Sequence, residues 1–188
     1  RGNSISVSSS GAQFTSIQDA IDSVTTASAV NPIIIDVGPG IYVENITLKP
    51  FVHLVGRSNG PAAPTIVGKV SANFVNPGEF VLINRMNIIY DIVADGEIAI
   101  HLVGGSLLND VFIGINCTDD YGFTALSQDA TTFQSVFYSG QLSVNCTASN
   151  RTTPIIGHRL CGTEDTATVL AQTSITCDAL SGNIVVRE

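Results

Sequence analysis

Acidic residues are the groups in this sequence best suited to chemistry. Asp91, Asp95 and Glu97 lie close enough together in the chain to offer carboxylate oxygens to a calcium ion. Asp119 and Asp120 precede an aromatic residue and a glycine, a composition typical of a polar turn. We interpret the first group as a solvated loop and the second as a turn. The sequence therefore predicts no metal site and no cofactor.

The histidines and cysteines do not have the spacing of a metal or redox site. No Cys-x-x-Cys pair occurs, and no histidine lies at ligand spacing from the cysteines, which are Cys117, Cys146, Cys161 and Cys177. His53 and His101 both begin a His-Leu-Val-Gly segment, so we expect them to be stacked structural residues. His158, beside Arg159, is the one histidine with a candidate functional role.

The composition excludes several classes of partner. Only 13% of the 188 residues are charged, and the formal net charge is −8, whereas an ordinary soluble domain has about 25% charged residues. Lys49 and Lys69 are the only lysines, so no basic stripe is available to follow a nucleic-acid backbone. No apolar run approaches the roughly 18 residues that cross a bilayer. Neither nucleic acid nor a membrane is an expected partner.

One amphipathic helix is predicted near the start of the chain. Its apolar positions are Ile17, Ala20, Ile21 and Val24, which is helical spacing. Thr15 or Ser16 can cap its start, with Gln18 or Asp19 completing a capping box. After residue 31 the sequence consists of short β-branched runs that are interrupted by Gly and Pro.

An internal repeat defines the expected fold. Residues 82–88, 107–113 and 132–138 are similar and lie 25 residues apart, and residues 170–176 are a more distant copy. Strands that recur without crossover helices suit a coil that rises one strand spacing, about 4.8 Å, per turn. We therefore predict an all-β fold, a single-stranded parallel β-helix of about six coils with a short N-terminal capping helix.

The repeat also predicts columns of like side chains. Asn84, Asn109, Gln134 and Gln172 occupy one register, so their amides are expected to form a hydrogen-bonded ladder. Cys117, Cys146 and Cys177 follow successive repeats and are expected to be small buried side chains in another column, with disulfides as the alternative. Such columns explain the composition, because stacked like charges repel one another.

Four Asn-x-Ser/Thr sequons are candidate glycosylation sites, and they begin at Asn45, Asn116, Asn145 and Asn150. With an even number of cysteines, they favour an extracellular or virion-surface location. The first residue is Arg1 and the last residues follow a strand-like run. We interpret the sequence as one domain, residues 1–188, that is part of a longer chain or assembly. Residues 1–31 form its N-terminal strand and helix, and residues 32–188 form the coils.

The opening of the chain resembles a known family. Residues 14–21 read Phe-Thr-Ser-Ile-Gln-Asp-Ala-Ile, residues 37–48 include Gly-Pro-Gly-Ile-Tyr-Val-Glu-Asn, and residues 53–56 read His-Leu-Val-Gly. These segments resemble pectinesterase-like members of the pectin lyase-like superfamily. The resemblance implies a right-handed β-helix whose N-terminal end is closed by the helix. Many β-helical surface proteins of bacteriophages and large DNA viruses have a similar opening.

The same family suggests a catalytic set that this sequence matches only in part. Pectinesterases use a nucleophilic Asp, an acid/base Asp and an oxyanion-binding Gln. The two carboxyl groups need different environments, because one must be ionised and the other protonated. By resemblance, Asp165 would be the nucleophile and Gln141 would hold the oxyanion, with Asp129 as a further candidate. Leu142 and Ser143 follow Gln141, where the family has its acid/base Asp. Polygalacturonases, on the same fold, use three aspartates and a Gly-His-Gly segment. Asp119, Asp120 and Asp129, followed by residues 157–159, resemble that set loosely, and Asp129 is a candidate on this ground.

These observations favour a non-catalytic, structural or receptor- or glycan-facing module of a surface assembly, most plausibly a virion fibre, spike or capsid-associated protein. Its expected partners are other subunits or domains of that assembly, with a homotrimer as one arrangement, and surface glycans. An open last coil is expected to need a cap or a neighbour. The alternative is a carbohydrate-active enzyme, either a pectinesterase-like esterase or a glycan-cleaving spike. A third interpretation is a glycan-binding module without turnover.

Overall fold

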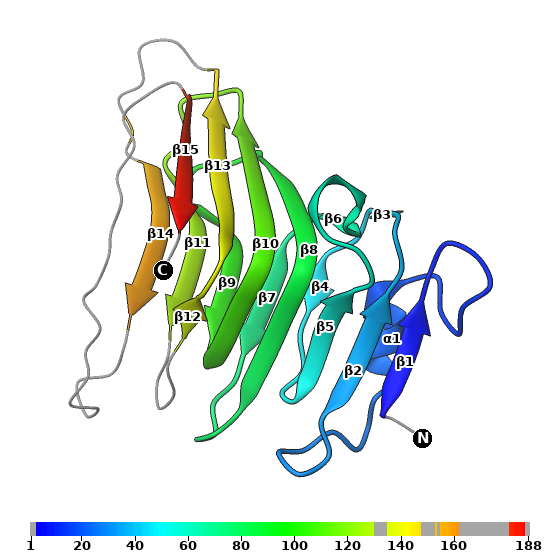
Figure 1. The fold of residues 1–188 in the computed structure, drawn as a ribbon. Coiled ribbons are helices and arrows are strands. Elements are labelled where there is room, and N and C mark those ends of the chain that lie inside the picture. Colours follow the sequence, from blue (N-terminus) through cyan, green and yellow to red (C-terminus); the bar gives the residue numbers. More distant parts are fainter. Residues whose placement is uncertain (1–2, 130–134, 148–152, 154, 162–180, 187–188) are drawn as a thin grey trace.

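The computed structural model of the chain describes residues 3–129, 135–147, 153, 155–161 and 181–186 (Figure 1). Strands dominate it, with one α-helix and one short 3₁₀ helix. The elements in chain order are β1 (Ser4–Val7), α1 (Ile17–Asp22), β2 (Ile33–Val37), β3 (Ile41–Tyr42), β4 (Ile46–Thr47), β5 (Val52–Gly56), η1 (Gly60–Ala62), β6 (Thr65–Val67), β7 (Val70–Asn73), β8 (Phe80–Ile92), β9 (Glu97–Val103), β10 (Gly105–Cys117), β11 (Phe123–Asp129), β12 (Val136–Phe137), β13 (Gly140–Cys146), β14 (Ile155–Cys161) and β15 (Ser181–Val186).

The strands form two sheets that wind around one core. The order of the first sheet is β1-β2-β5-β8-β10-β13-β15, with β3, β6 and β12 paired beside this path, and the order of the second is β4-β7-β9-β11-β14. All of these pairs are parallel except β13 with β15. Chain-distant strands therefore lie side by side, as a parallel β-helix requires, and the predicted fold is confirmed.

The long strands β8 and β10 turn a corner in the middle. The first part of β8 pairs with β5 and its last part with β6. Between these parts, Arg85 has φ 55°, and Asp110 has φ 53° at the equivalent position of β10. The corner therefore divides the first sheet into two parts, which form two different sides of the β-helix. One of these sides consists of β3, β6, the ends of β8 and β10 after the corner, β13 and β15. We call it the β3–β15 face.

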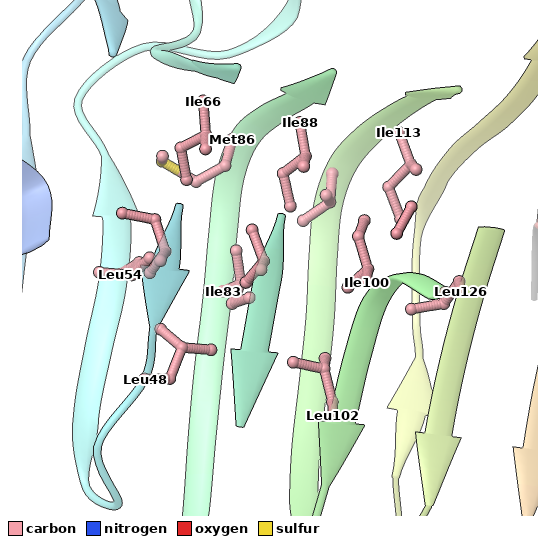
Figure 2. Packing of buried hydrophobic residues seen from close by; sticks show 14 of the residues in the cluster. Leu48, Leu54, Ile66, Ile83, Met86, Ile88, Ile100, Leu102, Ile113 and Leu126 are labelled. Atoms are coloured by element: carbon pink, nitrogen blue, oxygen red, sulfur yellow. The ribbon is translucent and has the colours of Figure 1, made fainter. Parts of the chain in front are cut away.

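Aliphatic side chains from both sheets fill the space between them (Figure 2). Leu54 and Ile83 come from the first sheet, and Ile100, Leu102 and Leu126 come from the second, and all five are fully buried. Their period of two along each strand places one side of the strand in the core. Burial of this kind contributes about 1.5–3 kcal/mol per large aliphatic side chain.

The coils differ in length, which changes two expectations. Leu82 lies opposite Leu107, a spacing of 25 residues, but Val111 lies opposite Gly140, a spacing of 29. The third copy of the repeat is therefore out of register with the second. The described strands form a solenoid of about four turns rather than about six, because later coils are longer than 25 residues and β15 does not continue the parallel coil.

The helix forms where the sequence predicted it and covers the N-terminal end of the coil. Ser16 is its N-cap, and the Ser16 hydroxyl accepts a hydrogen bond of 3.1 Å from the Asp19 N–H. Ile17, Ala20 and Ile21 are buried against the first strands. Among the described residues, no helix is long and apolar enough to cross a membrane.

Two other expectations are wrong. His53 lies in β5 of the first sheet and His101 in β9 of the second, so their identical tetrapeptides do not stack. The last coil is not open along the first sheet, because β15 pairs antiparallel with β13 from Gly140 to Asn145. Sequence repeats could not reveal this reversal, because the alternation of buried and exposed side chains is the same whichever way a strand runs.

The corner requires a glycine at the end of β5. A Cβ on Gly56 would stand 1.9 Å from the carbonyl oxygen of Arg85, which is backbone and cannot move aside cheaply. We expect Gly56→Ala to lower the free energy of unfolding by at least about 2 kcal/mol in urea denaturation. Asn59→Ala, at an exposed position nearby, is the control and should change it by less than about 0.5 kcal/mol. Equal stability of the two variants would contradict this close approach.

Candidate functional site

The residues that the family resemblance would make catalytic are not gathered in one sheet. Gln141 lies in β13 of the first sheet, half-buried, with Phe112 as its strand partner. Asp129 is the last residue of β11 in the second sheet, opposite Val103. Asp165 lies outside the described residues. Gln141 and Asp129 therefore belong to different walls of the β-helix.

A row of polar residues crosses the second sheet, and the sequence analysis did not find it. Ser71, His101, Ser127 and Arg159 are consecutive partners in β7, β9, β11 and β14. This places an imidazole between two hydroxyl-bearing residues. The hydroxyl of Ser127 is nevertheless not available to an external substrate, because this residue is only 1% exposed. The signal in the sequence was weak, because these residues are 26 to 32 positions apart.

His158 belongs to a hydrogen-bonded network in the core. Its Nε2 lies 3.0 Å from Gln128 Oε1, and Gln128 Nε2 donates to Ser106 Oγ at 3.0 Å. The chain of bonds continues from Ser106 to Ser135 at 3.2 Å and ends on the carbonyl of Gly104. Burial lowers the pKa of His158 to about 4. The imidazole is therefore neutral near pH 7 and contributes to the interior, not to a surface site.

Among the described residues, Glu97 is the most strongly perturbed carboxylate, and its partners explain why. Its Oε1 contacts Lys69 Nζ at 2.5 Å and accepts from the Tyr90 hydroxyl at 3.0 Å. Its Oε2 accepts from the N–H groups of Val93 and Ala94 at 2.8 and 3.2 Å. Burial opposes ionisation, but these donors outweigh it and lower the pKa of Glu97 to about 2.

Glu79 closes the preceding loop in the same way. Its Oε2 accepts from the N–H groups of Val75 and Asn76, both at 3.1 Å, and hydrogen bonds from Asn76 lower its pKa. The two loops share the pattern Val-x-x-Gly-Glu, at residues 75–79 and 93–97, and the glycine has positive φ in both. This short repeat was a sequence signal for two loop-closing carboxylates.

The candidate calcium ligands therefore have separate protein partners. Asp91 accepts from Asn116 Nδ2 at 2.8 Å, and Asp95 accepts from the Gly122 N–H at 2.8 Å. Glu97 is engaged as described above. No cluster of three potential metal ligands occurs among the residues that the structure describes.

Glu44 stabilises the helix from the next coil. Its carboxylate accepts from the N–H groups of Ile17 and Gln18 at 2.8 and 3.0 Å, and from the Ser16 hydroxyl at 2.7 Å. These N–H groups have no partner within a helix, and a negative charge at this end also favours the helix dipole. Glu44 thus takes the place that the capping-box prediction gave to Gln18 or Asp19.

The amide ladder is shorter than the repeat suggests. Asn109 Nδ2 donates to Asn84 Oδ1 at 3.1 Å, and Ser139 Oγ donates to Asn109 Oδ1 at 2.9 Å. Ser139, which lies 30 residues after Asn109, takes the place expected for Gln134. Gln134 and Gln172 lie outside the described residues. Cys117 and Cys146 are strand partners and buried thiols, whereas Cys161 lies in the other sheet and Cys177 is not described.

The sequons differ in the environment of their asparagines. Asn45 is exposed, and its Oδ1 accepts from the Lys69 N–H at 2.8 Å. Asn116 is half-buried and donates its Nδ2 to Asp91. Asn145 is exposed on β13, and Asn150 lies outside the described residues. Glycosylation at these positions stays a prediction.

Comparisons with known proteins give likenesses of fold. No protein-family model matches the chain, and no curated protein matches it. Similar solved structures include a pectin methylesterase mutant in complex with hexasaccharide IV (19% identity, TM-score 0.32), a pectin methylesterase in complex with hexasaccharide VII (18%, 0.33) and PemA from Erwinia chrysanthemi (17%, 0.32). Each alignment covers 88% of this chain and 67% of the other. The assignment of the fold rests on the strand pairing described above.

The buried His158 predicts an acid-sensitive fold. Its pKa is about 4 when folded, against 6.5 in its ordinary state, so the unfolded chain binds the proton first. We expect stability to fall by up to about 3 kcal/mol as pH decreases from 6.5 to about 4. Chemical denaturation of the wild type and of His158→Gln at several pH values between 7 and 4.5 measures this. The variant should show a shallower slope, with a remainder from His53, whose pKa burial also lowers. Identical slopes would contradict the assignment.

Glu97 predicts a further loss of stability, at lower pH. We expect Glu97→Gln to lower the free energy of unfolding at pH 7 by about 1.5–3 kcal/mol, because the charge-assisted bonds are lost. Since the folded pKa of Glu97 is about 2, the wild type should lose this advantage as pH falls from 4.5 to 2. Denaturation at pH 7, 4.5 and 3 tests this, with Asp110→Asn at an exposed position as control. An undiminished gap at pH 3 would argue against an ionised Glu97.

Proposed function

We propose that this chain is a non-catalytic structural module of a surface assembly, with faces that meet receptors, glycans or neighbouring subunits. The observation that carries the proposal is the use of the described carboxylates. Glu44 holds a helix end, Glu79 and Glu97 close loops, and Asp120 accepts from the hydroxyl of Thr153 at 2.6 Å. These described carboxylates are engaged in the scaffold.

Acid/base chemistry on an ester needs two carboxyl groups with different pKa values on one substrate. Glu97 is ionised, and its side chain is only 12% exposed and bound to Lys69. It has no proton to donate near neutral pH, and it could attack a substrate only by giving up the four hydrogen bonds that its carboxylate accepts. Gln141, the candidate oxyanion donor, has aliphatic and aromatic strand neighbours and lies in a different sheet from Asp129.

The surface suits assembly more than binding of a charged ligand. The described outer rows pair residues such as Asn116 with Asn145 and Thr65 with Asn87, and only 13% of the chain is charged. We propose a location on a virion surface or outside the cell, in a fibre, spike or capsid-associated protein. Other subunits or domains of the assembly would be its partners, a homotrimer being one such arrangement.

A direct assay separates this role from that of a pectinesterase-like enzyme. Methanol release from methylated pectin should be at the uncatalysed rate for the wild type and equally for Asp165→Asn and Gln141→Ala. Activity in the wild type that falls at least about 100-fold in Asp165→Asn would overturn the structural role. Asp110→Asn is the matched control, because it removes an exposed charge from the corner of β10. A glycan array on the same variants would show binding without turnover.

A further inference from the structure

The N-terminal end of the β-helix has three strand edges, and the chain closes one of them with a segment of its own. On β1, the Ser6 N–H donates to Gln13 Oε1 at 2.9 Å, and the Ser6 carbonyl accepts from the Phe14 N–H at 3.1 Å. The Ser8 N–H bonds to the Phe14 carbonyl at 3.0 Å. These are the backbone groups that another strand would need.

A single side chain closes the second edge, on β4. The Thr47 N–H donates to Gln18 Oε1 at 2.7 Å, and Gln18 Nε2 contacts the Thr47 carbonyl at 3.3 Å. The amide of Gln18, which projects from α1, therefore pairs with Thr47 as a peptide group of a neighbouring strand would. Closing an edge in this way prevents the addition of a strand.

The third edge, on β3, is different. The Gly40 carbonyl accepts from the Thr65 N–H of β6, and in a parallel pair alternate residues face the same neighbour. The backbone groups of Ile41 therefore point away from β6. The structure pairs β3 with β6 alone among the described strands. Ile41 and Val43 are 73% and 79% exposed, so apolar side chains flank an edge that the described residues leave open.

Among the described strands, the opposite end of the same face also finishes in a strand edge. The β3–β15 face ends with β15, which pairs with β13 and is last in the strand order (Figure 1). Successive partners along the face are Ile41, Thr65, Asn87, Phe112, Gln141 and Val185. The β15 sequence includes Ile-Val-Val and no charged residue.

We propose that β15 of one copy pairs with the β3 edge of a second copy, so that the chain associates head to tail along the β3–β15 face. Because β15 runs antiparallel to β13, a copy that continues the same axis would present β3 antiparallel to β15, which completes a regular ladder. The Ile41 position would then lie beside Val185. Such a contact is heterologous and can continue from copy to copy.

This inference deepens the proposed structural role. It rests on that role, because the partner is another subunit of the assembly. The two can fail separately, because methanol release reports chemistry and sedimentation reports assembly. The open β3 edge is short, so we expect association to be weak and visible at high protein concentration.

Sedimentation velocity on the full chain, over concentrations up to about 1 mM, tests the contact. The double variant Ile41→Lys with Val43→Lys places lysines on the edge, a device that blocks strand pairing. Val75→Lys with Val93→Lys is the matched control, because these valines are 74% and 67% exposed and lie in loops outside the face. We expect the edge variant to weaken association at least tenfold and the control to behave as the wild type.

Three results would overturn the proposal: a wild type that stays monomeric throughout, an edge variant that associates as the wild type does, or a control variant that loses association equally. Circular dichroism confirms that each variant is folded. Mixing Ile41→Cys with Val185→Cys under mild oxidation should give a disulfide-linked pair that peptide mass spectrometry can map. Mixing Val93→Cys with Val185→Cys should give no such pair, and equal yields in both mixtures would exclude the proposed register.

Discussion

Stacking of each residue on its equivalent in the next coil is the constraint on which this structure depends. Neighbouring strands lie about 4.8 Å apart, so a side chain meets its equivalent above and below before it meets anything else. Asn84 and Asn109 satisfy this by sharing a hydrogen bond, and Cys117 and Cys146 by being small and buried. Two like charges at this distance would repel. The low charge content of the chain is thus a property of the columns.

Several of the described acidic residues occupy places where stacking ends. Glu79 and Glu97 accept backbone N–H groups in loops between strands, and Glu44 does the same at the start of α1. A carboxylate in such a place satisfies several donors at once, whereas in a column it would face its own copy. Gln141 and Asp129, which the family resemblance made candidates, lie in different sheets and have no such shared role.

The sequence could predict features that recur locally, and it failed where one coil differs from the next. The helix at Ile17–Asp22 follows from its apolar stripe, and the pairing of Leu82 with Leu107 follows from a 25-residue repeat. The spacing of 29 between Val111 and Gly140 was hidden, because similar residues also occur 25 positions on. The two His-Leu-Val-Gly segments, which begin at His53 and His101, lie in different sheets. The sheet in which such a segment lies depends on the lengths of the coils and cannot be predicted from the segment itself.

The buried polar network lies where the coil length changes, and this position has a physical meaning. Ser106 belongs to the coil that is in 25-residue register with its predecessor, while Ser135 and His158 belong to the next, longer coil. Aliphatic side chains stacked in a column tolerate a register slip of two residues, because the side-chain period of two keeps them facing the core. A hydrogen bond between Gln128 and His158 does not, since a slip would leave both groups buried without a partner. The network therefore fixes the register of the strands at the point where the repeat no longer does so. Its presence in the core requires that His158 stays neutral.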